Sequence, residues 1–137
     1  MHRLSRPAQA PAAGANAGPW LAVEGLDCYR VSLEFQLLAT TLVPRSERIL
    51  RDQLEHASIS ICLNLAEGVG RGPAPDQARF FTIARGSATE CAAIVDLVRL
   101  RRIAPEGVCF AAREKLIRIV QMLTKLEART VAGGLRT

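Results

Sequence analysis

Proline and glycine divide this chain into four long segments, each with the length and composition of an α-helix. Pro44 ends the first segment, because the residue before a proline disfavours the helical conformation, and Pro105 opens the last. Asp27 is the expected N-cap of the first helix. The expected helices are Asp27–Leu42, Arg48–Gly68, Pro73–Arg102 and Pro105–Thr130. Apolar and polar residues alternate over no useful length, so no strands are expected.

Long helices joined by short loops pack antiparallel to their neighbours. We therefore expect an all-α fold, an antiparallel up-down-up-down four-helix bundle, over residues 25–130. With 137 residues the chain is one domain by length, and its 4 % of aromatic residues leaves the core to aliphatic side chains. Residues 1–24 are rich in Ala, Pro and Gly and are expected to be a disordered tail. Residues 131–137 are expected to be a flexible C-terminus.

The four cysteines are expected to be core residues. They are far apart in the sequence, with no C-x-x-C pair and no histidine cluster, so neither a metal site nor a cofactor is predicted. Unpaired thiols fit a reducing cytoplasm. No apolar run approaches the length needed to span a membrane, and the N-terminal residues lack the apolar core of a secretory signal.

The first helix carries two apolar stripes on nearly opposite sides. One contains Leu26, Tyr29, Leu33 and Leu37. The other contains the residues predicted to form an oligomer interface, which are Val31, Phe35, Leu38 and Leu42. A bundle buries one face of each helix, so a second apolar face indicates a surface that another molecule covers. The alternative is one wide core stripe.

Five residues interrupt apolar stretches of the second and third helices: Asn64, Glu67, Gly86, Ser87 and Glu90. The pairs Asn64/Glu67 and Ser87/Glu90 each share a helix face, and we expect them to meet as a buried hydrogen-bonded network, with Gly86 allowing close helix contact. The alternative is that the two glutamates act as a general acid and base. No nucleophile with an activating base is present, so no enzymatic activity is expected.

The net charge of +5 permits an acidic partner. Arg3 and Arg6 lie in the tail, which leaves 16 basic and 13 acidic residues in positions 20–137. Arg99, Arg101 and Arg102 cluster at the end of the third helix. They either complement the helix dipole there or contact a nucleic acid.

Two motifs carry a family resemblance. The segment Ser60–Gly68, followed by Ile83–Ser87 and Glu90, resembles the pattern S-I-P-x-N-I-A-E-G … I-A-x-G-S … E of a bacterial four-helix-bundle family. Its first members were found encoded in intervening sequences of the large ribosomal RNA gene. Cys62 and Leu63 depart from this pattern, because the family commonly has proline and a small polar residue there. The similarity covers about residues 26–128.

The resemblance implies an antiparallel bundle that forms a homopentamer without enzymatic activity. Related accessory variability determinants of diversity-generating retroelements bind nucleic acid and a reverse transcriptase. We therefore expect a cytoplasmic, non-enzymatic homo-oligomeric scaffold with five copies favoured. Its expected partners are other copies of itself, RNA or DNA, and a reverse transcriptase, and no membrane partner is expected. The alternative is a protein–protein interaction module with no nucleic-acid role.

Overall fold

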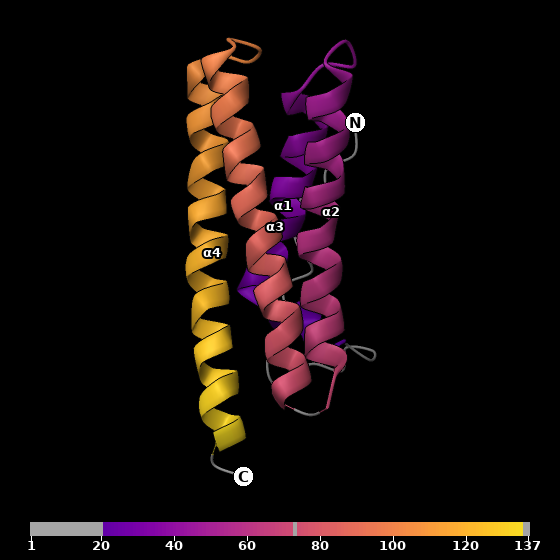
Figure 1. The fold of residues 1–137 in the computed structure, drawn as a ribbon, viewed down its shortest axis with the longest axis vertical. Helices are drawn as coiled ribbons and strands as arrows, with labels where there is room; N and C mark the ends of the chain where they lie inside the picture. Colours follow the sequence, from indigo (N-terminus) through magenta and orange to yellow (C-terminus); the bar gives the residue numbers. More distant parts are fainter. Residues whose placement is uncertain (1–20, 73, 136–137) are drawn as a thin grey trace, which may run out of the picture.

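The computed structural model describes residues 21–72 and 74–135, which fold into four long α-helices (Figure 1). The helices are α1 (Asp27–Leu42), α2 (Arg48–Gly70), α3 (Ala74–Leu100) and α4 (Glu106–Leu135), preceded by the short 3-10 helix η1 (Ala22–Gly25). No strand occurs in either described range. The prediction of an all-α four-helix fold is confirmed.

The helix bounds differ from the predicted ones mainly at the C-terminal ends. The bounds of α1 agree, but α2 continues past Gly68 to Gly70, and α4 continues past Thr130 to Leu135. Most of the short helix η1 falls within the residues predicted to be a tail, and its Val23 is buried. Residues 1–20, predicted to be disordered, and residues 136–137 lie outside the described ranges.

The start of α1 corrects the expected role of Asp27. The N-cap residue is Leu26, whose side chain makes no capping hydrogen bond, and Asp27 is the first helical residue. Its carboxylate pairs with Arg30 one turn later. A negative charge in a first turn still complements the positive end of the helix dipole.

Contacts between helices show that neighbours run antiparallel. Positions rising along α3 meet positions falling along α4, in the pairs Arg85–Glu127, Asp96–Arg113 and Arg99–Glu106. Consecutive connections lie at alternating ends of the bundle in Figure 1. Each helix packs on two others, whereas α2 and α4 occupy opposite corners with no Cα–Cα approach within 8 Å.

The core corrects the predicted oligomer interface. Phe35 is fully buried, and Val31 and Leu42 are 5 % and 2 % exposed, all within one cluster with residues of the other helices. Leu38 is partly buried against the same cluster. The interface prediction at these residues was wrong because they form the inner face of α1. The outward stripe is the other one, in which Leu33 and Leu37 are 39 % and 44 % exposed.

No described helix is both long and apolar enough to cross a membrane. The four thiols are free and buried, as expected for core residues. Burial raises the pKa of Cys28 and of Cys91 to about 12 and that of Cys62 to about 11. The thiolate forms are therefore strongly disfavoured in the folded chain.

These shifts predict a loss of stability in alkaline solution. A thiol whose folded pKa lies above its ordinary value of 9.0 contributes stability that is complete below pH 9 and is lost as the pH rises toward 12. Between pH 9 and 10 the unfolding free energy should fall by about 1 kcal/mol for each such thiol. Urea denaturation at both pH values measures the fall, which should be smaller in Cys91→Ala. Equal falls in the variant and the wild type would contradict the assignment.

Candidate functional site

A polar cluster joins α2 to α3 on the outer side of that helix pair. The hydroxyl oxygens of Ser60 and Ser87 are 2.8 Å apart and share a hydrogen bond. Asn64 Nδ2 donates to the Ser60 carbonyl at 2.8 Å and to Ser60 Oγ at 3.0 Å. Asn64 and Ser87 thus belong to one network, as expected, but Ser60 connects them.

The two glutamates do not join this cluster. Glu67 pairs at 2.5 Å with Arg71, the residue that directly follows α2, and the Glu67 side chain is 48 % exposed. Glu90 is exposed. The expectation of a buried network containing both carboxylates is therefore wrong. Arg85, the other cation considered as their partner, pairs instead with Glu127 of α4, also at 2.5 Å.

The close contact expected at Gly86 occurs at a different glycine. A Cβ on Gly86 would meet no atom within 4 Å, and the residue is exposed. A Cβ on Gly68 would lie 2.8 Å from Phe81 Cε1 and 3.1 Å from Phe80 Cβ. The absent side chain of Gly68 therefore lets α2 approach the start of α3, and it explains why this glycine lies inside a helix.

Alanine substitutions should separate the two glycines. Gly86→Ala should raise the unfolding free energy by up to about 1 kcal/mol, because alanine has the higher helix propensity. Gly68→Ala should lower it by about 1–3 kcal/mol, because the added methyl group overlaps two phenylalanines. Urea denaturation compares both variants with the wild type. Stabilisation by Gly68→Ala would contradict the packing described above.

A basic end of the bundle is formed by two connections distant in sequence. The α1–α2 and α3–α4 connections lie at the same end (Figure 1), and the ion pair between Arg101 and Glu47, at 3.5 Å, links them. Five arginines gather there: Arg45, Arg48, Arg99, Arg101 and Arg102. Only the last three were predicted as a cluster from the sequence. The predicted up-down topology places the α1–α2 and α3–α4 connections at the same end, and this could have indicated that Arg45 and Arg48 belong to the cluster.

The three arginines predicted to contact nucleic acid differ in their surroundings. Arg99 binds Glu106 with two hydrogen bonds of 2.9 and 2.7 Å, and Arg101 pairs with Glu47. Arg102 is exposed and forms no ion pair within the described part of the chain. The same holds for Arg45 and Arg48. Three guanidinium groups at this end are thus open to an anionic partner.

Arg102 also has an uncommon backbone conformation. Its φ of 56° is left-handed, and it ends α3 in a Schellman motif, in which Ile103 N–H donates to Val98 O at 2.9 Å. Glycine is preferred at this position, and another residue costs about 1–2 kcal/mol there. The arginine at position 102 therefore has a conformational cost that a glycine would avoid.

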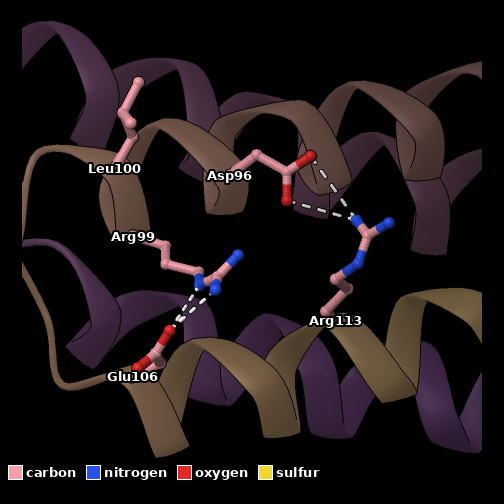
Figure 2. Close-up of a pocket in the computed structure, with 5 residues that line it drawn as sticks. All are labelled: Asp96, Arg99, Leu100, Glu106 and Arg113. Atoms are coloured by element: carbon pink, nitrogen blue, oxygen red, sulfur yellow. Dashed lines mark hydrogen bonds and ion pairs between the residues drawn. The ribbon is translucent and has the colours of Figure 1, made fainter.

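An open pocket of about 630 Å³ lies beside this end, between α3 and α4. Figure 2 shows two arginines extending into it from opposite helices, each held by a carboxylate of the other helix, in the pairs Arg99–Glu106 and Asp96–Arg113. Leu100 forms the apolar part of its rim. Because the charges balance, the pocket itself attracts anions weakly. Residues 21–72 and 74–135 contain no group of three potential metal ligands.

The comparisons with known proteins agree with this fold. No curated protein matches the sequence. A family model described as 23S rRNA-intervening sequence protein matches residues 24–125, which include all of α1, α2 and α3 and most of α4. The matched region contains the Ser60–Ser87 cluster and the basic end. The chain therefore belongs to the 23S rRNA-intervening sequence protein family.

Proposed function

We propose that this protein is a non-enzymatic homo-oligomeric scaffold, with five copies favoured, that binds nucleic acid at its basic end. The observation that carries the proposal is the number of large apolar side chains on outward helix faces. Among them, Ile49, Leu63 and Phe110 are 79 %, 64 % and 64 % exposed. Apolar surface repeated over several helices is typical of a protein interface. The buried free thiols support a reducing compartment, and we propose the cytoplasm.

We propose that nucleic acid is bound by the basic ends of several copies at once. One copy offers three open guanidinium groups, at Arg45, Arg48 and Arg102. Arginine binds phosphate oxygens through several parallel hydrogen bonds. Several copies in one assembly present these groups many times, and linked weak contacts add up to a much higher affinity.

A second candidate is a protein–protein interaction module without a nucleic-acid role. The ion pairs of Arg99 and Arg101 favour it, because two of the five arginines at the basic end are already neutralised by Glu106 and Glu47. The same apolar faces would then serve only protein partners.

Self-association is tested by sedimentation equilibrium of the wild-type chain at micromolar concentration. The expected mass is several times 14.8 kDa, with five as the favoured multiple. Burial of the exposed apolar side chains supplies the free energy, at about 25 cal/mol for each Å² removed from water. A wild-type monomer under these conditions would contradict the scaffold.

Nucleic-acid binding is tested by fluorescence anisotropy with labelled RNA and DNA between 50 and 200 mM salt. Affinity should fall steeply with salt, since phosphate contacts release counterions. Arg45→Ala/Arg48→Ala should weaken binding by about tenfold or more and flatten the salt dependence. Arg102→Gly should weaken binding while raising the unfolding free energy.

The matched control is Arg71→Ala/Arg79→Ala, which removes two arginines near the α2–α3 connection at the other end. It should leave affinity close to the wild-type value. No binding at 50 mM salt by a confirmed oligomer would favour the interaction module instead.

A further inference from the structure

The pocket between α3 and α4 combines hydrogen-bond donors and acceptors with an exposed aromatic ring. The ion pairs Arg99–Glu106 and Asp96–Arg113 cross it from one helix to the other, with open space between them (Figure 2). An adjoining hollow of about 580 Å³ shares these four residues and adds Phe110, which is 64 % exposed. Positions 106, 110 and 113 lie on one face of α4. Phe110 therefore borders the same cavity as both ion pairs.

Both ion pairs leave polar atoms free for a ligand. Arg99 directs its Nε and Nη2 to the same Glu106 oxygen, Oε1. Arg113 donates to Asp96 through Nη1 alone. Among the described residues, Glu106 Oε2 accepts no hydrogen bond, and Arg99 Nη1 and Arg113 Nη2 donate none. Because a carboxylate only accepts and a guanidinium only donates, the pocket offers both kinds of group while its total charge is near zero.

A neutral, planar and polar molecule suits these features better than a phosphate group. A nucleobase is uncharged at neutral pH and presents donors and acceptors along its edge, and an aromatic side chain can stack on the face of any base. Cytosine can donate its amino group to a carboxylate and accept from a guanidinium. Uracil has a carbonyl in place of that amino group, so it would present a second acceptor to the carboxylate.

The pocket is continuous with the basic end of the bundle. Arg99 and Glu106 also line a neighbouring hollow whose wall includes Arg102. The guanidinium group of Arg102 is open to a phosphate, as are those of Arg45 and Arg48. A strand whose phosphates contact these arginines can therefore place a base in the pocket. The base must be unstacked, as bases are in single strands and loops, because a duplex keeps them inside the helix.

We infer that the pocket binds one unstacked base of a single-stranded nucleic acid, with a preference for a base that carries an amino group. Phe110 stacks on the base, Glu106 accepts a hydrogen bond from its amino group, and the arginines of the basic end bind the adjacent phosphates. The inference rests on the nucleic-acid binding proposed above and specifies which form of nucleic acid is bound.

The experiment compares labelled oligocytidine, oligouridine of the same length and a duplex RNA by fluorescence anisotropy at about 50 mM salt. The wild-type chain should bind oligocytidine about fivefold more tightly than oligouridine, because only cytosine donates to the carboxylate. Glu106→Gln should bring these two affinities close together, because glutamine can also donate to the uracil carbonyl. Phe110→Leu keeps an apolar side chain without an aromatic face, so it should weaken binding of both single strands by about fivefold and leave the duplex affinity unchanged.

The matched control is Ile117→Ala, which alters an outward α4 side chain that is 47 % exposed and lines neither hollow beside the ion pairs. It should bind all three probes like the wild type, and circular dichroism and sedimentation should show every variant folded and assembled as the wild type is. Equal wild-type affinities for oligocytidine and oligouridine, an unchanged preference in Glu106→Gln, or full single-strand affinity in Phe110→Leu would overturn the base pocket and leave the basic end as the binding surface. Failure of the wild type to bind any of the probes would overturn the nucleic-acid function as well.

Discussion

The burial of one side of each helix against its two neighbours is the constraint on which the other features of this molecule depend. The core takes the inward faces, with Phe35 of α1, Ile61 of α2 and Leu116 of α4 almost completely buried. Within residues 21–72 and 74–135 no third helix covers the outward faces, so Leu63 and Phe110 are largely exposed there. The same arrangement brings the α1–α2 and α3–α4 connections to one end and keeps α2 and α4 apart. The core, the exposed apolar side chains and the basic end are thus all consequences of this packing.

Much of this fold could be predicted from the sequence, because helix length and the positions of proline are local properties. The bounds of α1 and the start of α2 agree with the prediction. Which of the two apolar stripes of α1 faces the core could not be predicted. The two stripes of α1 are both apolar, and periodicity gives their spacing without saying which one faces inward. Gly68 was expected to end α2, but the helix continues to Gly70, and Gly68 instead allows close packing against Phe81.

The candidate sites could be predicted only in part for a related reason. Asn64 and Ser87 were expected to share a network, but Ser60, which joins them, lies in an ordinary helical position whose importance depends on the facing helix. Glu67 was expected to be buried, but Arg71 is available one turn away and pairs with it near the surface. The charge of an arginine cluster is visible in sequence, whereas the neutralisation of Arg99 by Glu106 depends on how α4 packs.

The positive charge at the basic end of one copy is modest, so its effect on a polyanion depends on how neighbouring copies are oriented. Arg102 has a left-handed backbone conformation that favours glycine, and it follows α3 at the end of the bundle where Arg45 and Arg48 precede and begin α2. In a symmetric dimer with the bundles antiparallel, these ends would point in opposite directions, and each would act alone. In a ring of copies in one orientation they lie together on one face, where a polyanion can contact several at once. We therefore expect the relative orientation of associated copies to determine how many basic ends one nucleic acid can contact.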